Sequence, residues 1–427
     1  MKPERFNYWL QRVYFIPIFN LSKALRNEFR PRFLLLFING KVGQTNNMET
    51  RLKHRIALST FYFLSGFGFS TWTSRIPTIK EVIGLNDAEQ GSTLLTMPIA
   101  SLIGLPLSGF LVSKFNTRKP ILFGYILYAL SLLSLSFASN TAMLIGSMFC
   151  IAFFMRIVNV SMNTQVITVQ KLFQKKINAS FHAMWSIGGI AGVGFTTLMI
   201  VSDINMITHL ILFTCMVIPL SLFSYFNLIA ADKATTGTKL ILSKPEPYIV
   251  SLGFIIFFAS ICEGGMFDWS GVFFRDVVNS EIFTFGFLLF MTFMAISRLL
   301  SDKIIHKIGS KLTFAISAAL IISGVLTAVL FPYFVPALIG FSIIGIGVAP
   351  IVPMALAQAG GSKKYAPGIV VAIISTYGTT GMLIGPPIIG YLSHGFGLRW
   401  AFLFLTITGL AIIPLTRLFF KIKGSEE

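Results

Sequence analysis

Residues 262–271 read CEGGMFDWSG and combine two carboxylates, a tryptophan and a glycine pair. They continue an apolar run, YIVSLGFIIFFASI, whose length suits a membrane-spanning helix. An ionised side chain at bilayer depth costs at least about 2.5–3.5 kcal/mol, so it faces a bundle interior or a water-filled cavity. A carboxylate there can exchange a proton near neutral pH and link the exchange to a change of shape. Glu263 and Asp268 are therefore candidate proton-coupling residues and, with Trp269, candidate substrate contacts.

The same stretch has structural interpretations that the sequence leaves open. Trp269 can be an aromatic anchor at the membrane interface. Asp268 can cap a helix end or pair with Arg275. Gly264 and Gly265 are expected to let the helix bend beside the first carboxylate, since glycine costs roughly 1 kcal/mol relative to alanine in a helix interior. A flexing helix next to a carboxylate would serve gating in a transporter.

A second set of polar residues follows helical spacing in the run 142–170. Arg156, Asn159, Asn163 and Gln170 recur every three to four residues or a multiple of that spacing, so they share one narrow helix face. Arg156, Asn159 and Asn163 are candidate substrate-binding residues that line a cavity. Amides can also hydrogen-bond neighbouring helices in a membrane bundle, which is the structural alternative. Arg156 is the expected partner of the first carboxylate of residues 262–271.

Other residues suggest conformational roles. Arg298 and Asp302 are four residues apart, so we expect an intrahelical ion pair that acts as a conformational latch. Pro386 and Pro387 are expected to kink their helix. His182 stands near the start of an apolar run, where it can be a structural histidine or a group that titrates near neutral pH.

The composition specifies the elements that must position these groups. The chain has 427 residues, of which 54% are hydrophobic and 12% are charged, whereas soluble domains are about one quarter charged. Long apolar runs recur along it, and each can cross a bilayer core of about 30 Å as a helix. We predict an all-α membrane protein with about twelve transmembrane helices. The predicted spans are 56–75, 92–115, 120–139, 142–170, 180–202, 206–230, 248–273, 283–302, 312–331, 334–359, 368–392 and 400–420.

The net charge of +18 does not indicate nucleic-acid binding, because the basic residues occupy every second loop rather than one stripe. The positive-inside rule then places both termini and the central loop in the cytoplasm. These loops contain Lys114, Arg118, Lys119, Lys171, Lys175, Lys176, Lys233, Lys239, Lys244, Lys303, Lys307, Lys311, Lys363 and Lys364.

The organisation is predicted to be two six-helix halves with basic or polar flanks. The first fifty residues form a basic cytoplasmic extension, or lie upstream of a natural start at Met48. The predicted parts are 1–50, the extension; 51–230, the first half; 231–247, a cytoplasmic loop; 248–420, the second half; and 421–427, a cytoplasmic tail.

The two halves resemble each other. Gly188 and Gly192 in the fifth predicted span correspond to Gly381 and Gly385 in the eleventh. Glycines four residues apart allow two helix backbones to approach closely. Basic loops also follow both the second and the eighth spans. A parallel internal duplication, as transporters have, explains this pattern.

This plan resembles the major facilitator superfamily. Several stretches are similar to the bacterial branch typified by the inner-membrane protein YbjJ, related to the fucose permeases: SMNTQVITVQ at 161–170, SFHAMWSIGGIAG at 180–192, EGGMFDWSGVFFRD at 263–276 and GPPIIG at 385–390. The resemblance covers residues 51–420 and implies a transporter without naming its substrate. Asn159 and Gln170 stand where that branch commonly carries acidic residues, so the resemblance supplies no proton carrier on that helix.

We therefore expect a secondary transporter in the bacterial inner membrane, surrounded by lipid. It would move a small polar organic solute, with a sugar or sugar derivative favoured by the fucose-permease resemblance, and protons would drive it. Efflux of apolar or drug-like compounds is the first alternative, and a non-transporting sensor or scaffold is the second. We expect a monomer and no nucleic-acid partner.

Enzymatic and cofactor-dependent activities are not expected. The chain contains no GxxxxGK[ST] nucleotide-binding loop, no HExxH and no GxSxG. Its three cysteines lie in separate apolar runs, and its five histidines are scattered, so no metal or haem site is predicted. The sequence therefore predicts a protein that is not an enzyme and binds no cofactor.

Overall fold

The computed structural model describes residues 45–174, 177–230, 232, 246–359 and 367–426. Most of the predicted extension, 1–50, and most of the central loop, 231–247, lie outside them. Contacts divide the chain into Met1–Leu52 and Lys53–Glu427, and the second unit contains every candidate site residue. The two-half division within that unit stays a prediction.

All regular elements in the described ranges are helices. The first helix group consists of α4 (Thr45–Thr73), α5 (Ile76–Ile83), α6 (Asp87–Leu94), α7 (Thr96–Lys114), α8 (Arg118–Leu135), α9 (Thr141–Gln170), α10 (Asn178–Val201) and α11 (Met206–Tyr225). The second group consists of α12 (Pro247–Asp276), α13 (Phe285–Ile308), α14 (Ser310–Leu330), α15 (Phe334–Val348), α16 (Ile351–Ala359), α17 (Pro367–Phe396), α18 (Leu398–Ala401) and α19 (Phe404–Glu426).

Each predicted apolar run overlaps one helix or two consecutive helices, so the all-α prediction is confirmed. By length and hydropathy, nine helical segments within the described residues can cross a membrane. Helices α4, α13 and α17 overlap the remaining predicted spans. The count of twelve stays a prediction.

Two short helices, α5 and α6, lead into α7. Gly84, at φ 76°, ends α5 in the left-handed conformation that favours glycine. Asn86 then begins α6 with a capping box, in which its side chain accepts from the Glu89 N–H and its own N–H donates to the Glu89 carboxylate. These turns hold the charged residues of α5 and α6 against the second helix group.

Glycines make the closest helix contacts in both groups. A methyl group added at Gly188, Gly192, Gly381 or Gly385 would overlap a backbone carbonyl oxygen of the facing helix. The facing carbonyls belong respectively to Phe63 and Phe67 of α4 and to Phe257 and Ile261 of α12. The predicted close approach is therefore confirmed for α4 with α10 and for α12 with α17.

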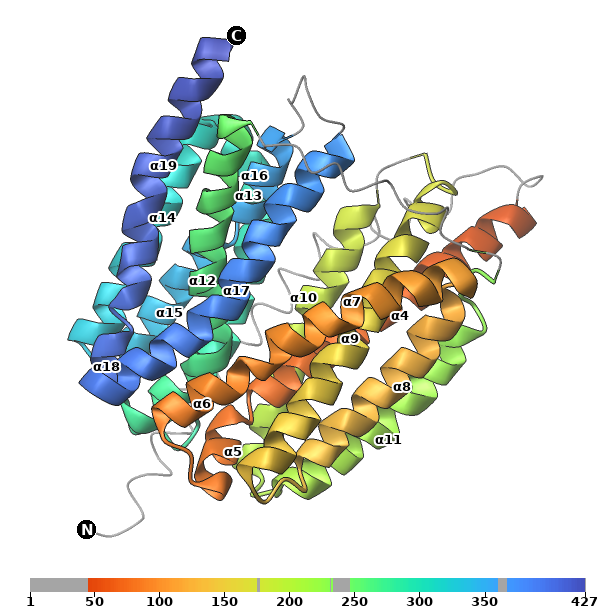
Figure 1. The fold of residues 1–427 in the computed structure, drawn as a ribbon, viewed down its shortest axis with the longest axis horizontal. Helices are drawn as coiled ribbons and strands as arrows, with labels where there is room; N and C mark the ends of the chain where they lie inside the picture. Colours follow the sequence, from red (N-terminus) through yellow and green to blue (C-terminus); the bar gives the residue numbers. More distant parts are fainter. Residues whose placement is uncertain (1–44, 175–176, 231, 233–245, 360–366, 427) are drawn as a thin grey trace, which may run out of the picture. The chain divides into compact units, whose positions relative to one another are not determined.

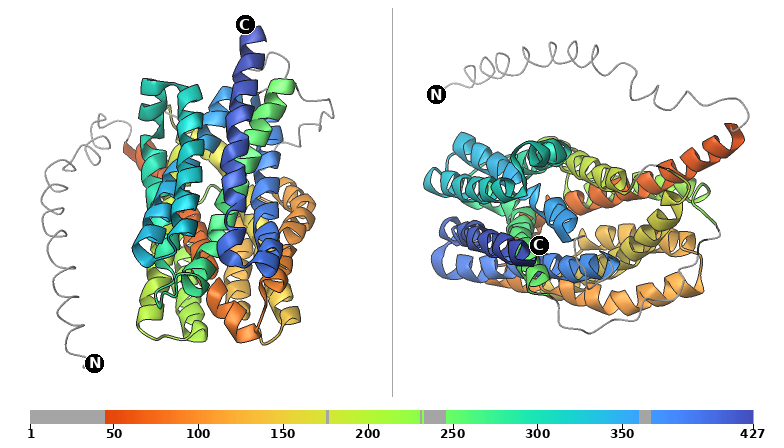
Figure 2. Two further views of the ribbon diagram at one scale, coloured as in Figure 1. Left: turned by 90° about the vertical axis from the view of Figure 1, so that its left-hand side faces the viewer. Right: turned by 90° about the horizontal axis from the view of Figure 1, so that it is seen from above.

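Several helices of the two groups contact one another within the described residues (Figure 1). Helix α6 packs against α17, α5 contacts the carboxyl end of α12, and α10 packs against α13. Seen from above in Figure 2, α17 runs beside the orange helices of the first group, whereas α13 to α15 lie farther from them. These contacts determine which polar residues of the two groups can come together.

Candidate functional site

A cavity of about 490 Å³ lies between α7 and α17, and we name it the Arg156 cavity. Helix α7 contributes an apolar wall, α17 contributes four hydroxyl side chains, and α9 contributes Arg156. The lining residues are Leu95, Pro98, Ile99, Leu102, Leu105, Arg156, Ser375, Thr376, Thr379, Thr380, Leu383 and Ile384. The volume suits a small organic molecule.

Arg156 is half-buried in this cavity. Its Nε donates to the carbonyl oxygen of Ser101 over 3.4 Å, and it forms no ion pair with the described part of the chain. The sequence predicted an ion pair between Arg156 and Glu263, and the structure does not form this pair. Helix α7 passes close to Arg156 because Gly104 leaves room for it: a methyl group there would lie 3.4 Å from the Arg156 Cβ.

The other polar residues of α9 differ from one another in their surroundings. Asn163 is exposed and accepts a hydrogen bond from the Tyr62 hydroxyl at 2.6 Å. Gln170 accepts from the Ile177 N–H at 2.7 Å and thereby holds the turn that leads into α10. Asn159 is half-buried and forms no hydrogen bond within the described ranges. The stripe is thus present, but only Arg156 lines the cavity between α7 and α17.

Glu263 forms an ion pair with Arg298, for which the sequence predicted a pair with Asp302. The Arg298 guanidinium lies 2.7 Å from the Glu263 carboxylate, with 29% and 12% of the two side chains exposed. The predicted Arg298–Asp302 pair cannot be compared, because the Asp302 side chain lies outside the described part. Exposed His182 stacks edge-on against Tyr62, with ring centroids 5.7 Å apart. Tyr62 and His182 belong to the first helix group, whereas Glu263 and Arg298 belong to the second.

Asp268 lies five residues beyond Glu263 on α12. Its carboxylate forms no hydrogen bond or ion pair with the residues that the structure describes. It lines a small cavity of about 100 Å³, the Asp268 cavity, which shares Pro98 and Leu383 with the Arg156 cavity. The alternative pairing with Arg275 is not formed, because Arg275 contacts Glu81.

The glycines and the tryptophan of CEGGMFDWSG pack against α17. Gly264 lies against the Met382 carbonyl, which has no i+4 N–H donor because residue 386 is proline. Trp269 is fully buried, and its indole N–H donates to the Pro386 carbonyl at 2.9 Å. Trp269 is thus neither an interfacial anchor nor a residue of either cavity.

The remaining gating candidates occupy the same contact. Gly265 lies against Ile389 and Leu405, while Pro386 and Pro387 lie inside α17. Helix α12 is continuous from Pro247 to Asp276. The glycines therefore support close helix packing here, and their role in bending stays a prediction.

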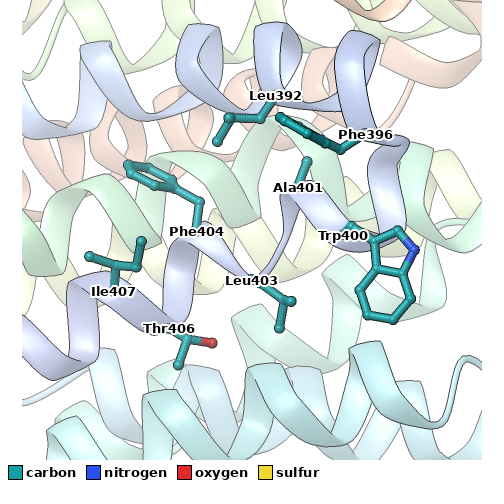
Figure 3. Close-up of a pocket in the computed structure, with 8 residues that line it drawn as sticks. All are labelled: Leu392, Phe396, Trp400, Ala401, Leu403, Phe404, Thr406 and Ile407. Carbon is teal, nitrogen blue, oxygen red and sulfur yellow. The ribbon is translucent and has the colours of Figure 1, made fainter.

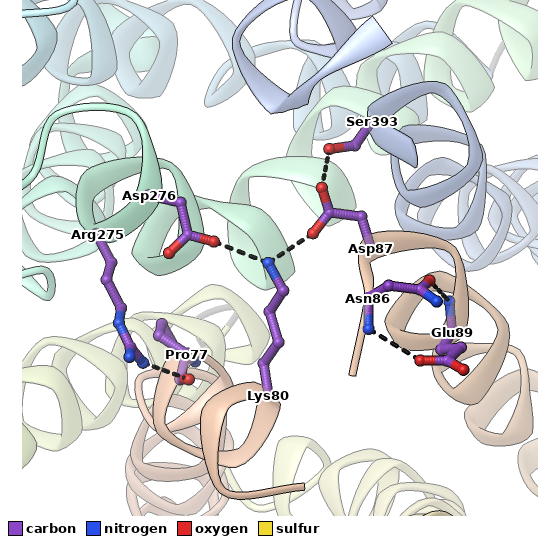
Figure 4. Close-up of polar contacts among 8 residues, drawn as sticks. All are labelled: Pro77, Lys80, Asn86, Asp87, Glu89, Arg275, Asp276 and Ser393. Carbon is purple, nitrogen blue, oxygen red and sulfur yellow. Dashed lines mark hydrogen bonds and ion pairs between the residues drawn. The ribbon is translucent and has the colours of Figure 1, made fainter. Parts of the chain in front are cut away.

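Five charged side chains join the two helix groups, and we name them the Lys80 cluster: Lys80, Glu81, Asp87, Arg275 and Asp276. Figure 4 shows all of them except Glu81. Lys80 of α5 lies 2.6 Å from Asp87 of α6 and 2.7 Å from Asp276 of α12. Arg275 contacts Glu81. Burial alone would lower the pKa of Lys80, but its bonds to Asp276 and Asp87 raise it above the usual value.

Two further contacts extend the Lys80 cluster. Arg275 donates to the Pro77 carbonyl at 2.6 Å, and Ser393 of α17 donates to Asp87. Sequence reasoning did not predict the cluster. The available signal was the concentration of charge in two loops, at 80–89 and 275–281, that the predicted topology places on the same side of the membrane.

A larger cavity of about 800 Å³ lies among α17, α18 and α19 (Figure 3). Phe396, Trp400 and Phe404 are among its lining side chains, and no described charged residue lines it. Its composition is that of a surface facing apolar molecules. It contains none of the groups that the sequence singled out.

Comparisons with known proteins agree with this architecture. An MFS-type transporter of Yersinia pestis is 28% identical over 357 residues, which are 83% of this chain and 93% of the relative. Membrane protein MosC of Rhizobium meliloti is 25% identical over 358 residues, or 83% of this chain and 88% of MosC.

Solved structures show the same fold at low sequence identity. A bacterial homologue of the human lysosomal transporter Spinster, in an inward-facing and unoccupied conformation, has a TM-score of 0.69 at 15% identity, covering 87% of this chain and 98% of that one. The nucleoside transporter NupG has a TM-score of 0.68 at 14% identity, covering 87% of this chain and 99% of that one.

The sequence profile of the Major Facilitator Superfamily matches residues 58–379. The expectation of a multi-pass membrane transporter rather than an enzyme is confirmed, while the narrower YbjJ-like and fucose-permease relationship stays a prediction. The chain belongs to the Major Facilitator Superfamily.

Proposed function

We propose that this transporter moves a small polar organic solute by alternating access, driven by protons. Membership of the superfamily establishes membrane transport of small solutes. The observation that carries the finer proposal is the pair of adjoining cavities between the helix groups. They are lined by a cation, Arg156, and a carboxylate, Asp268, neither of which forms an ion pair with the described residues. Unpaired charges in a transporter cavity mark a substrate or ion pathway.

The Lys80 cluster supports alternating access. It joins the two helix groups at one end of the bundle, so opening that end requires breaking the Lys80–Asp276 and Arg275–Glu81 contacts. The positive-inside rule assigns this end to the outer side and both termini to the cytoplasm. The chain would then be closed to the outside, the state in which the Spinster homologue was solved.

Proton coupling is proposed to use the two carboxylates of α12. A proton taken up by Glu263 would neutralise its carboxylate and release Arg298, which changes a contact between α12 and α13. A proton taken up by Asp268 would remove a charge from the cavity without breaking an ion pair. Either event alters the relative free energies of two conformations, as coupling requires.

A second candidate function is efflux of apolar or drug-like compounds. The apolar wall of the Arg156 cavity favours it, because five side chains in and just before α7 offer no hydrogen-bonding group: Leu95, Pro98, Ile99, Leu102 and Leu105. The four hydroxyl side chains and the guanidinium across the cavity favour the polar solute. A transporter-shaped sensor would bind the same ligands but would not move them.

The test begins with thermal unfolding of the purified chain against sugars, amino acids, nucleosides, small peptides and apolar drugs, since a ligand stabilises the state that binds it. The stabilising ligand is then radiolabelled and offered to proteoliposomes under an imposed pH gradient. We expect accumulation that disappears with a protonophore. Flux no greater than in empty liposomes would contradict transport, and flux that ignores the pH gradient would contradict proton coupling.

Location and assembly belong to the same proposal. We infer a monomer in the bacterial inner membrane, with protons and lipid as its other partners. Reporter fusions after Lys176 and Lys364 are expected to report cytoplasm, and a fusion after Asp276 is expected to report the outer side. An external fusion at Lys176 would overturn this orientation.

A further inference from the structure

The Arg156 guanidinium is a cation without a counter-ion in the described part of the chain. It carries five N–H donors and stays protonated, yet within the described ranges it forms one long hydrogen bond, to Ser101. Of the three carboxylates of α12, Glu263 is engaged by Arg298 and Asp276 by Lys80, while Asp268 lines the adjoining cavity and forms no ion pair with Arg156. A half-buried cation is stabilised by an anion, so the chemistry of this site is incomplete without a negative partner.

The wall opposite Arg156 carries four hydroxyl side chains. Ser375, Thr376, Thr379 and Thr380 lie on one face of α17, because their spacing repeats every four residues. Ser375 and Thr379 form no hydrogen bond with the part of the chain that the structure describes. Their hydroxyls can donate to, and accept from, the body of a ligand.

The third wall is apolar and completes the outline of a ligand. Helix α7 presents Leu102 and Leu105 to the cavity, and neither can bond a hydroxyl group. The volume of about 490 Å³ is that of a site for one small organic molecule. The three walls therefore match a molecule with an anionic group, a hydrogen-bonding body and an apolar edge.

We propose that the Arg156 cavity binds the carboxylate of a small organic acid. Arg156 binds the carboxylate through its planar fork of N–H donors. Ser375 and Thr379 form hydrogen bonds with the polar groups of the acid, and α7 contacts the apolar edge of the acid. One cation neutralises one charge, so a monoanion fits better than a phosphate dianion. This inference rests on the proposed function and narrows the solute from polar organic molecules to organic monoanions.

The experiment compares acids with their neutral amides in thermal unfolding of the purified full chain. Suitable pairs are D-glucuronate with D-glucuronamide and 4-hydroxybenzoate with 4-hydroxybenzamide. We expect at least one acid to raise Tm by a few degrees while its amide leaves Tm unchanged. Arg156→Gln should remove the shift, whereas Arg156→Lys and Thr379→Val should reduce it. Arg417→Gln, which changes an exposed arginine of α19, should preserve it.

Three outcomes would overturn the proposal: an amide as effective as its acid, an acid shift that survives Arg156→Gln, or no acid that shifts the folded wild-type chain. A further arm uses nanodiscs of phosphatidylcholine with and without phosphatidylglycerol. If the anionic lipid alone stabilises the chain through Arg156, the anion is a lipid headgroup and the substrate assignment fails.

Flux separates this inference from the proposed function. Proton-driven accumulation of a neutral sugar, with no binding of acids, would leave the proposed function standing and refute the anion site. Arg156-dependent binding of an acid, without transport of that acid or any other solute into proteoliposomes, would support the anion site and refute the proposed function.

Discussion

The helix pairs α4–α10 and α12–α17 are built by the same packing device but carry different chemistry. In each pair, two glycines four residues apart lie against carbonyls of the partner helix. Helix α4 has no charged residue from Ala57 to its end at Thr73, whereas α12 carries Glu263 and Asp268 after its own contacts with the glycines. The difference teaches that the two pairs share the backbone contact, and that of the two helices that supply the carbonyls only α12 carries carboxylates within this stretch.

The largest expected effect comes from neutralising the carboxylates that distinguish α12. We expect Glu263→Gln to abolish proton-driven accumulation while solute exchange persists, because a group that cannot titrate cannot couple. It should also lower stability by about 1–3 kcal/mol, less than for a fully buried pair, because Arg298 is 29% exposed. Proteoliposome uptake and thermal unfolding measure the two effects.

Asp268→Asn provides the contrast on the same helix. It leaves no cation without its partner, so stability should change little, and a loss of accumulation with solute exchange retained reports coupling rather than substrate binding. The double variant Glu263→Gln/Arg298→Gln should recover stability without recovering coupling. If Glu263→Gln still accumulates solute against its gradient, Glu263 is not the coupling residue and Asp268 becomes the candidate.

The next effect concerns the packing that both pairs share. Gly192→Ala and Gly385→Ala should each destabilise the chain by about 1–3 kcal/mol, because the added methyl group overlaps a facing carbonyl. Gly194→Ala and Gly395→Ala are matched controls on the same helices, with no atom within 4 Å of the new group. Because alanine favours a helix over glycine, the controls should keep or slightly raise Tm. Equal losses of Tm in variants and controls would refute close approach as the cause.

A smaller effect should separate two buried tryptophans. Trp269→Phe removes the donor to the Pro386 carbonyl and should cost about 1–2 kcal/mol. Trp72, at the end of α4, is also buried, but its indole N–H has no partner in the described part of the chain. Both substitutions lose buried volume, but Trp72→Phe breaks no hydrogen bond and should therefore cost less than Trp269→Phe. The same loss of Tm in both variants would refute a specific role for the Trp269 hydrogen bond.

The smallest effect on stability is expected at the Lys80 cluster. Lys80→Met should change stability by about 0–1 kcal/mol, because its ion pairs are partly exposed. It should nevertheless add longer distances between spin labels at Val82 and Phe396, two exposed positions on α5 and α17. Lys119→Met, at an exposed lysine, is the control. An unchanged distance distribution would exclude the cluster as a gate.

The pH dependence of this cluster follows from the raised pKa of Lys80. A lysine whose pKa is raised by folding contributes stability below its unfolded value and loses that contribution as the pH rises through the folded value. The Lys80 contribution should therefore be constant through neutral pH and disappear above about pH 10.5. Lys80→Met should flatten this alkaline loss in a pH series of Tm.

Sequence reasoning predicted those features that depend on one helix at a time. The length of the apolar runs predicted the helices, and the four-residue spacing of the glycines predicted the close contacts of Gly192 and Gly385. It did not give the Glu263–Arg298 pair, because spacing along α12 contains no information about which helix lies opposite. The sequence did not predict that α17 buries Trp269, because its position near the end of an apolar run is also typical of an interfacial residue. Its acceptor is a backbone carbonyl, which a pattern of side chains does not indicate.

Lys80 contacts one carboxylate from each helix group, Asp87 of its own group and Asp276 of the other. In the proposed separation of the groups, Lys80 can release Asp276 and keep Asp87, so its ammonium retains one counter-ion. The transition state for opening then lacks the penalty of an isolated charge. Such a shared lysine favours rapid opening over tight closure, and makes the turnover rate, rather than the resting structure, the property most sensitive to Asp87.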